Sequence, residues 1–462
     1  MDAAVAIRQD RPSMSDACII GAGSSGISSC QVLKARGISF DCFEKGSNVG
    51  GLWRYGNDSG LSSAYSSLFI NTSRKVMAYR AYPMPDDYPD YPHHSQVAAY
   101  FDDYVDHFGL REHIRFRTEV KQVTPVEGGG WDVTTDRGQT HRYRAVLVAN
   151  GHHWDPKLPD YPGEFLGDTL HSHYYRTNDD FAGKNVLVVG FGNSAVDIAC
   201  DTGRVARQVF LSTRRGAHVL PKYLRGQPVD ELVTPANSRL PFWVTRIMFA
   251  RLLKQAQGSM EDYGLPRPDH RLGEAHPTIS SELLPAIGHG RVKPKPGIER
   301  LEAHAVRFAD GSEEPIDAIV WCTGYRISFP FIPADVLEVK DNELPLYKMV
   351  VPPELDGLYF IALLQPLGAI MPLAEAQSEW VADLLAGESA LPSREEMWKE
   401  IRRRREALGR RYVRSTRHTI QVDFFPYLRE IAKERRAGRR RRTHGRGTVP
   451  AQPPAPELTP AG

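Results

Sequence analysis

Two short apolar runs, each followed by a glycine-rich turn, constrain the fold of this chain more than any other feature. The first run, at 17–20, leads into the turn 21–26, and the second, at 186–189, leads into the turn 190–195. Apolar runs of this length are typical of buried parallel strands, and a helical repeat follows each turn. A helix that begins at such a turn offers free N–H groups to a phosphate. The two patterns therefore predict an α/β chain with two dinucleotide-binding sites.

The first turn has all the parts of a dinucleotide-binding fingerprint. A strand at 40–43 follows the helix and leads directly into the acidic residue Glu44. We expect Gly21 to permit the tight turn, Gly23 to admit a pyrophosphate, and Gly26 to allow close packing of helix on strand. Glu44 is expected to bind ribose hydroxyls. The predicted cofactor-binding residues here are Gly21, Ala22, Gly23, Ser24, Ser25, Gly26 and Glu44.

The second turn differs from the first in two ways that bear on the cofactor. Ala195 replaces the third glycine, a change that the fingerprint tolerates. The next strand, at 209–211, is followed not by an acid but by Arg214 and Arg215. Arginine pairs with a 2′-phosphate that a carboxylate would repel, so the site is predicted to bind NADPH, unless both arginines are ordinary surface residues. The predicted binding residues are Gly190, Gly192, Asn193, Ser194, Ala195, Arg214 and Arg215.

Two dinucleotide sites in one chain indicate electron transfer from a nicotinamide to a flavin. Disulfide reductases share this plan, but they require a redox-active cysteine pair. The five cysteines, at positions 18, 30, 42, 200 and 322, form no C-x-x-C or C-x-x-x-x-C motif, and their spacing predicts no metal site. A reductase of that type is therefore disfavoured, and a monooxygenase remains.

The order of these elements predicts a nested layout, in which the FAD-binding domain is interrupted by the NADPH-binding domain. Two further apolar runs, at 145–149 and 318–322, are also expected to be buried strands. The end of the chain is rich in arginine and proline and has no apolar face, which is typical of disorder. The predicted divisions are a flexible N-terminus at 1–14, the first part of the FAD-binding domain at 15–165, the NADPH-binding domain with an inserted cap at 166–317, the returning part of the FAD-binding domain with C-terminal helices at 318–432, and a disordered basic tail at 433–462.

Composition narrows the range of partners. The formal net charge is only +2, which argues against nucleic acid. The first 14 residues contain no apolar run, and no stretch approaches the roughly 18 apolar residues that a membrane helix needs. We therefore expect a cytoplasmic protein without a stable membrane anchor. Its expected partners are a small lipophilic molecule and dioxygen, and a homodimer is possible.

A segment between the two turns carries a more specific pattern. Phe165, Gly167, His171 and Tyr175 stand in the arrangement F-x-G-x-x-x-H-x-x-x-Y. This arrangement marks the flavin-containing monooxygenases, and the chain resembles the class B members of that family. It resembles their soluble bacterial-type form, similar to the vertebrate enzymes without the membrane anchor. Shorter resemblances lie at 50–54, at 71–73, at 322–325 with Cys322 in place of alanine, and at 365–369.

The resemblance implies FAD and NADPH as cofactors and oxygen transfer from a flavin C4a-hydroperoxide. It implies catalytic roles for Asn71, His276 and His171, although packing at a domain hinge is an equally weighted interpretation of His171. The chemistry needs a dry site with hydrogen bonds to the flavin, and the Asn71 amide can both donate and accept them. The further cofactor-binding residues that the resemblance implies are Gly51, Leu52, Trp53, Tyr65, Asn71, Thr72, Asp197, Thr323, Gly324 and Gln365.

Three activities remain open at this point. Tyr175 favours oxygen transfer to a soft nitrogen or sulfur atom, because the pattern of dedicated Baeyer–Villiger enzymes ends in tryptophan. His276 favours Baeyer–Villiger insertion into a ketone or aldehyde, because heteroatom-oxidising vertebrate branches typically carry glutamate there. The third activity is that of an NADPH oxidase that releases hydrogen peroxide without oxygenating a substrate.

Overall fold

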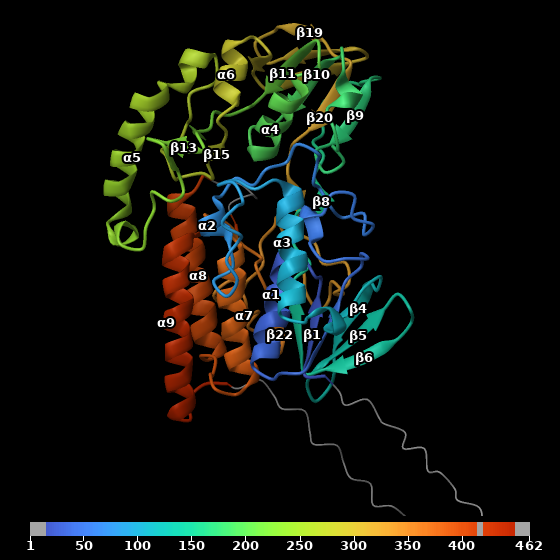
Figure 1. Cartoon of the computed structure of the whole chain (residues 1–462), viewed down its shortest axis with the longest axis vertical. Coiled ribbons are helices and arrows are strands. Elements are labelled where there is room, and N and C mark those ends of the chain that lie inside the picture. The colour runs from blue at the N-terminus through green and yellow to red at the C-terminus, as the bar shows by residue number, and fades with distance from the viewer. Residues whose placement is uncertain (1–14, 414–418, 449–462) are drawn as a thin grey trace, which may run out of the picture.

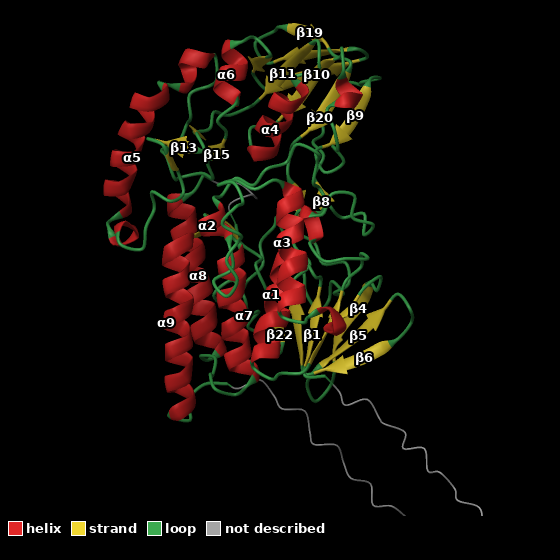
Figure 2. Ribbon diagram, in the orientation of Figure 1, coloured by secondary structure: helices red, strands yellow, loops and turns green. Residues whose placement is uncertain are grey.

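The chain folds into two lobes, each built around a five-stranded parallel sheet (Figures 1 and 2). The computed structural model describes residues 15–413 and 419–448. The first sheet consists, in spatial order, of β22 (Leu358–Phe360), β7 (Ala145–Val148), β1 (Ala17–Ile20), β2 (Phe40–Phe43) and β3 (Ile114–Arg115). The second consists of β16 (Val292–Lys295), β11 (Gln208–Ser212), β10 (Asn185–Val189), β20 (Ala318–Trp321) and β9 (Asp168–His171).

Helices cover both sheets. The first lobe carries α1 (Ser24–Ala35), α2 (Arg74–Met77), α3 (His94–His107), α7 (Met371–Leu385), α8 (Arg394–Arg411) and α9 (Phe424–Thr443). The second lobe carries α4 (Asn193–Thr202), α5 (Phe242–Gln257) and α6 (Leu283–Gly288). Single turns of 3₁₀ helix are η1 (Gly51–Trp53), η2 (Arg111–His113), η3 (Asp179–Phe181), η4 (Asn237–Arg239) and η5 (Met260–Tyr263).

Smaller sheets border the two main ones. Two of them are three-stranded antiparallel sheets, namely β4 (Val120–Pro125), β5 (Trp131–Thr135) and β6 (Thr140–Tyr143), and β17 (Ile298–Glu302), β18 (Ala305–Phe308) and β19 (Glu313–Pro315). The two-stranded pairs are β8 (Asp155–Pro156) with β21 (Tyr325–Arg326), β12 (Val219–Leu220) with β15 (Thr278–Ile279), β13 (Tyr223–Leu224) with β14 (Gln227–Pro228), and β23 (Gln365–Leu367) with β24 (Gln421–Asp423).

The two predicted nucleotide-binding strands lie at the centres of the two sheets. β1 pairs in parallel with β2 and β7, and β10 pairs in parallel with β11 and β20. All four residues of β1 are buried, because helices and loops cover both faces of the sheet. The predicted α/β fold with two Rossmann-like domains is confirmed.

One predicted boundary is wrong. We expected the chain to return to the FAD-binding domain at residue 318, but β20 pairs with β10 along its whole length, from Ala318 to Trp321. Strand β20 is therefore part of the second sheet, and the return begins after Trp321. An apolar run predicts that a strand is buried, but not which of two similar sheets it joins.

The two connections between the lobes lie side by side. Strand β8 belongs to the outgoing connection and β21 to the returning one, and they pair antiparallel, with Tyr325 opposite Pro156 and Arg326 opposite Asp155. Arg326 also forms an ion pair of 3.1 Å with Asp155. The lobes are thus joined by a two-stranded ribbon.

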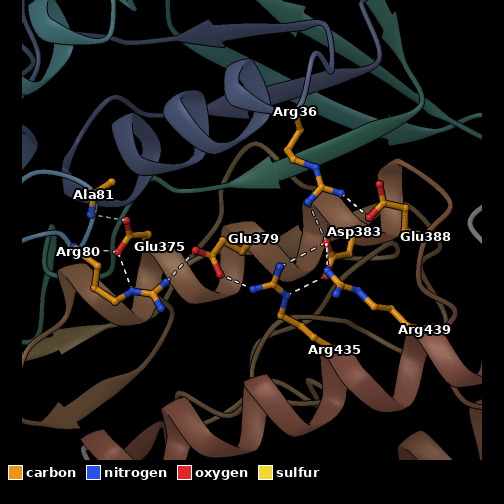
Figure 3. Close-up of polar contacts among 9 residues, drawn as sticks. All are labelled: Arg36, Arg80, Ala81, Glu375, Glu379, Asp383, Glu388, Arg435 and Arg439. Carbon is orange, nitrogen blue, oxygen red and sulfur yellow. Dashed lines mark hydrogen bonds and ion pairs between the residues drawn. The ribbon is translucent and has the colours of Figure 1, made fainter.

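The predicted disordered tail is wrong over the part that the structure describes. Helix α9 continues to Thr443 and packs along α7 (Figure 3). The buried carboxylate of Asp383 on α7 accepts hydrogen bonds from Arg435 and Arg439 of α9 and from Arg36, which follows α1. Three arginines of the predicted solvated charge run, Arg435, Arg439 and Arg441, therefore pair with carboxylates of the first lobe. Residues 1–14 and 449–462, where a flexible N-terminus and the end of the tail were predicted, lie outside the described ranges.

None of the helices in the described ranges combines the length and the apolar composition that crossing a bilayer requires.

Candidate functional site

A large cavity of about 1550 Å³ lies between the lobes. Both lobes and both connections contribute to its lining, most of which is apolar. Of the predicted site residues, those that line the cavity are Leu52, Trp53, Tyr65, Asn71, Thr72, Gly190, Gly192, Asn193, Ser194, Ala195, Asp197, Arg214, Arg215, His276, Thr323, Gly324 and Gln365. The structure thus brings together residues that are up to about 300 positions apart in the sequence, as cavities between domains commonly do.

The first glycine turn has the geometry that a pyrophosphate needs. Gly21 has φ +95°, and a Cβ on Gly26 would lie 1.8 Å from the Gly21 carbonyl oxygen, so neither position accepts a side chain. Gly23 caps α1 without a side-chain hydrogen bond, which leaves the N–H groups of the first helical turn open to an anion. A Cβ on Gly23 would meet no protein atom closer than 3.7 Å. The protein's own packing therefore does not require glycine at this position, which is consistent with the predicted approach of a pyrophosphate.

Glu44 and η1 border the same turn. The Glu44 carboxylate accepts hydrogen bonds of 2.7 Å from the N–H groups of Ala22 and Gly46. Burial raises the pKa of Glu44, and these two hydrogen bonds oppose the rise. The Cα atom of Gly51 lies against Gly23, since a Cβ on Gly51 would come within 3.1 Å of it. These residues form a backbone-lined cradle that fits FAD. The individual contacts between these residues and FAD remain predictions.

The second glycine turn repeats this geometry beside the cavity. Gly190 has φ +127°, and a Cβ there would lie 2.5 Å from the Cys322 carbonyl oxygen. Gly192 caps α4 without a side-chain hydrogen bond. Both arginines beyond β11 are exposed at the cavity, and Arg215 forms an ion pair of 2.7 Å with Asp269. The turn therefore fits the phosphates of a second dinucleotide, and of the two arginines only Arg215 forms an ion pair among the described residues.

Asn71 carries a polar atom for which the described protein provides no partner. Its side-chain oxygen is buried and accepts no hydrogen bond, although the residue lines the cavity. A buried acceptor without a donor costs about 1–3 kcal/mol. A donor from a bound cofactor or substrate would remove this cost, so the geometry is consistent with the predicted catalytic position.

The segment that carries Asn71 is held by two residues that the sequence analysis missed. Lys222, which precedes β13, donates a hydrogen bond of 3.2 Å from Nζ to the carbonyl oxygen of Ile70. Asp230, which follows β14, accepts hydrogen bonds of 2.8 and 2.9 Å from the N–H and the hydroxyl of Ser73. Both come from the second lobe, so the position of the second lobe determines the position of the Asn71 segment.

Tyr65 makes a second connection between the lobes. Its hydroxyl donates a hydrogen bond of 3.0 Å to the carboxylate of Asp197 on α4. Burial raises the pKa of Asp197 to about 6, while Lys222 and Tyr65 act to lower it. Both residues were predicted to contact a cofactor, and their bond lies in the wall of the cavity.

The two predicted catalytic histidines lie in different places. His276 lines the cavity, two residues before β15, and its Nδ1 lies 3.5 Å from Nε2 of Gln421. His171 is buried at the end of β9 and is not among the residues that line the cavity. Its Nδ1 accepts a hydrogen bond from the His173 N–H, and its ring contacts the edge of Tyr325 in the ribbon between the lobes. Burial lowers the pKa of His171 to about 4, so the ring is neutral near pH 7. The structure therefore favours the hinge-packing interpretation of His171 over the catalytic one.

Comparison with known sequences identifies relatives over most of the chain. Residues 15–438 match the sequence profile of a family described as flavin-binding monooxygenase-like. The chain is 40% identical over 438 residues to flavin-containing monooxygenase 5 of Rattus norvegicus, an alignment that covers 90% of this chain and 81% of the relative. It is 34% identical over 437 residues to dimethylaniline monooxygenase [N-oxide-forming] 2 of Oryctolagus cuniculus, covering 90% of this chain and 82% of the relative.

Solved structures share the two-lobed fold. S-allyl-L-cysteine S-oxygenase from Allium sativum is 26% identical, with a TM-score of 0.68, and the match covers 94% of this chain and 93% of that chain. An open form of cyclohexanone monooxygenase superposes with a TM-score of 0.70 at 19% identity, covering 92% of this chain and 98% of that chain. At 19% identity, the similarity to cyclohexanone monooxygenase shows a shared fold and carries no conclusion about activity.

Proposed function

Because the chain belongs to the flavin-binding monooxygenase-like family and is an FAD- and NADPH-dependent monooxygenase, we propose that it transfers oxygen to a soft nitrogen or sulfur atom of a small lipophilic substrate. In the overall reaction, one atom of dioxygen enters the substrate and the other leaves as water. NADPH supplies the two electrons, and a proton is consumed. The reduced flavin, when bound, supplies the activation of dioxygen.

The observation that carries the proposal is the unpartnered oxygen of Asn71 in a largely apolar cavity. The apolar wall excludes water and suits a lipophilic substrate, while the Asn71 amide can accept and donate hydrogen bonds in a cavity that the second glycine turn also lines. The two glycine turns hold the two cofactors in this proposal, with Glu44 at one ribose and Arg214 at the 2′-phosphate. A soft nucleophile needs no base or acid from the protein to react with electrophilic oxygen. The cavity agrees with this. His171 is buried outside the cavity lining, so His276 is the one predicted catalytic histidine among the described lining residues.

A second activity, Baeyer–Villiger oxidation of ketones, is supported by His276. A carboxylate at this position would add negative charge to the cavity and disfavour an anionic oxygen nucleophile. Histidine is neutral or cationic and can donate a hydrogen bond to such an anion. The two reactions need different protonation states of the same oxygen donor, so a single side chain can shift their ratio.

A paired measurement of sulfide and ketone oxidation by the same enzyme tests this proposal. Wild type is expected to form sulfoxide from an alkyl aryl sulfide, and a smaller amount of ester from a ketone. His276→Glu should lower the ketone rate relative to the sulfide rate, whereas His276→Gln, which keeps a hydrogen-bond donor without negative charge, should lower it less. An enzyme that oxidises the ketone but not the sulfide would contradict the leading proposal, and an unchanged ratio in His276→Glu would exclude the role of His276.

We further infer a reducing compartment and retain the homodimer as a prediction. All five cysteines are unpaired thiols, four of them buried, which suits the cytoplasm. Fractionation of the native host would test the location, and analytical ultracentrifugation would test the dimer.

A further inference from the structure

Helix α4, which begins directly after the second glycine turn, carries two aspartates on one side. Asp197 and Asp201 are four positions apart, so their side chains lie one turn apart on the same face. Like charges at this spacing repel each other, and Asp201 is only 5% exposed, so both carboxylates need hydrogen-bond donors. Asp197 accepts a hydrogen bond of 3.0 Å from the hydroxyl of Tyr65. Asp201 accepts one of 2.7 Å from the hydroxyl of Tyr175. Each carboxylate of this pair is therefore held by a tyrosine.

The two tyrosines pack against each other. Their rings meet edge to face with centroids 5.5 Å apart, and both rings are part of the hydrophobic core of the second lobe. Tyr175 follows β9 of the second sheet, whereas Tyr65 lies between η1 and α2 of the first lobe. The first lobe thus inserts one side chain into the core of the second, directly beside the last residue of the motif 165–175.

Hydrogen bonds continue from this pair to the first glycine turn. The N–H of Ser66 donates a bond of 2.8 Å to the carbonyl oxygen of Arg176. The Arg176 guanidinium donates a bond of 2.9 Å to the carbonyl oxygen of Ser62. The Ser62 hydroxyl donates a bond of 2.8 Å to the carbonyl oxygen of Leu52 in η1, which borders the first glycine turn. A continuous series of contacts therefore joins the first turn to the helix that begins at the second.

Tyr175 and Asp201 lie behind the cavity wall. Neither is among the residues that line the cavity. Burial raises the pKa of Tyr175 well above its usual value, so the hydroxyl stays protonated and acts as the donor. The other oxygen of Asp201 accepts a hydrogen bond of 3.3 Å from Asn178 and forms an ion pair of 3.4 Å with Arg204. The contacts of this pair are thus with the protein, and any effect on the reaction is exerted through α4.

We propose that Tyr175 is a positioning residue for hydride transfer from NADPH to the flavin, and that it acts by holding α4 through Asp201 in a fixed orientation relative to the first lobe. Asp201 lies at the end of α4 opposite to the glycine turn, so a tilt of the helix at Asp201 displaces the turn. A displacement of about 1 Å can slow a reaction about a hundredfold. Tyr175 takes no part in the bonds that form and break. The inference rests on the proposed binding of NADPH at the second turn.

Anaerobic stopped-flow mixing of the FAD-loaded enzyme with NADPH, combined with calorimetric titration with NADP⁺, tests this role. In Tyr175→Phe the limiting rate of flavin reduction should fall about tenfold to a hundredfold, whereas the Kd for NADP⁺ should stay within about twofold of wild type. Asp201→Asn keeps an oxygen that accepts from Tyr175 and should retain most of the rate, but Asp201→Leu should be as slow as Tyr175→Phe. The double variant Tyr175→Phe/Asp201→Leu should be no slower than either single one, because both changes break the same bond. Without NADPH, the amides of residues 62–66 should exchange hydrogen faster in Tyr175→Phe than in wild type.

A second buried tyrosine–aspartate bond provides the matched control. Tyr143 donates a hydrogen bond of 2.9 Å to Asp41, and both residues lie in the first lobe. Tyr143→Phe should lower the melting temperature by an amount similar to Tyr175→Phe and leave the rate of flavin reduction unchanged. An unchanged rate in Tyr175→Phe, or equal slowing in both variants, overturns the proposal. If Tyr175→Phe does not fold, Tyr65→Phe, which removes the companion bond to Asp197, decides in its place, and a wild-type rate there overturns the proposal.

The double variant Arg214→Ala/Arg215→Ala tests the placement of NADPH separately. It should weaken the binding of NADP⁺ about tenfold or more, because the contacts to the 2′-phosphate are lost. Unchanged binding of NADP⁺ would contradict NADPH at the second turn and overturn the role of Tyr175 with it. Weakened binding together with a wild-type rate of flavin reduction in Tyr175→Phe would contradict the role of Tyr175 alone.

Discussion

Lys222 donates a hydrogen bond of 3.2 Å from its ammonium group to the carbonyl oxygen of Ile70, the residue before Asn71. The lysine lies in the second lobe and the acceptor in the first, so the bond joins the two lobes and holds the backbone beside the proposed catalytic asparagine. Asp230 secures the other side of the same segment through Ser73. Together they tie the geometry of Asn71 to the arrangement of the two lobes.

Removing the hydrogen bond from Lys222 to Ile70 is predicted to uncouple NADPH oxidation from oxygen transfer without loss of bound FAD. In Lys222→Met, a charged hydrogen bond worth about 1.5–3 kcal/mol is lost, and the Asn71 segment gains freedom. We expect hydrogen peroxide formed per NADPH to rise severalfold while FAD content stays at the wild-type level. Lys75→Met is the matched control, because it removes an exposed ion pair of 3.6 Å with Glu231 between the same two lobes and leaves the Ile70 bond intact. Equal uncoupling in both variants would contradict a specific role for Lys222.

Substitution of two glycines in the first turn is predicted to cause two different defects, one in folding and one in FAD binding. Gly26→Ala should prevent folding of the turn, because the new Cβ would lie 1.8 Å from the Gly21 oxygen. Gly23→Ala should fold, because its Cβ would meet no protein atom within 3.7 Å, but should bind FAD about tenfold more weakly or worse as the pyrophosphate is displaced. Melting of the apoprotein and fluorescence titration with FAD check the two parts. A stable Gly23→Ala protein with wild-type FAD affinity would remove the pyrophosphate from this turn.

The preference for NADPH should depend more on Arg214 than on Arg215. Arg215 is already paired with Asp269, whereas a 2′-phosphate would provide Arg214 with a charge-assisted partner. Such a bond is worth about 1.5–3 kcal/mol, so Arg214→Ala should lower the ratio of kcat/KM for NADPH over NADH roughly tenfold to a hundredfold. Arg207→Ala, an exposed arginine of the same lobe outside the cavity lining, is the control and should leave the ratio unchanged. A larger effect of Arg215→Ala than of Arg214→Ala would reverse the assignment.

Truncation within helix α9 is predicted to lower the stability of the protein, whereas the composition of the C-terminal segment predicted a disordered tail that contributes none. A chain that ends at Lys433 loses Arg435 and Arg439 and leaves the buried Asp383 with Arg36 alone (Figure 3). Breaking a buried ion pair costs about 3–5 kcal/mol, so the melting temperature should fall by several degrees or the protein should become insoluble. A chain that ends at Thr448 keeps every described contact of α9 and is the control. Identical melting of both truncated chains would show that α9 adds no stability beyond Lys433.

The parts of the account that sequence could predict are the local ones. Each of these features depends on a few neighbouring residues and can be recognised in the sequence. They are the turns 21–26 and 190–195, the acid after β2 and the arginines after β11. The grip of Lys222 and Asp230 on residues 70–73 joins segments about 150 positions apart, and no local pattern records it. Helix α9 was misread because a run of arginines has the same composition whether it faces water or the carboxylates of α7.

The assignment of β20 shows the same limit at the level of the fold. Its four apolar residues indicate a buried strand, and both sheets offer equivalent parallel neighbours. Only the path of the connections between the lobes decides between them. His171 was similarly ambiguous, because burial behind the cavity wall is a property of the assembled lobes and not of the motif that contains it.

Isotope labelling is the decisive test of oxygen transfer from dioxygen to a substrate at the expense of NADPH. The FAD-loaded enzyme, NADPH and an alkyl aryl sulfide are incubated under ¹⁸O-labelled dioxygen, and the product and consumed NADPH are quantified together. We predict a sulfoxide that carries one labelled oxygen atom, formed in near-equal amount to the NADPH consumed, with little hydrogen peroxide. Consumption of NADPH that yields an equal amount of hydrogen peroxide and no labelled product, across sulfides, tertiary amines and ketones, would contradict it.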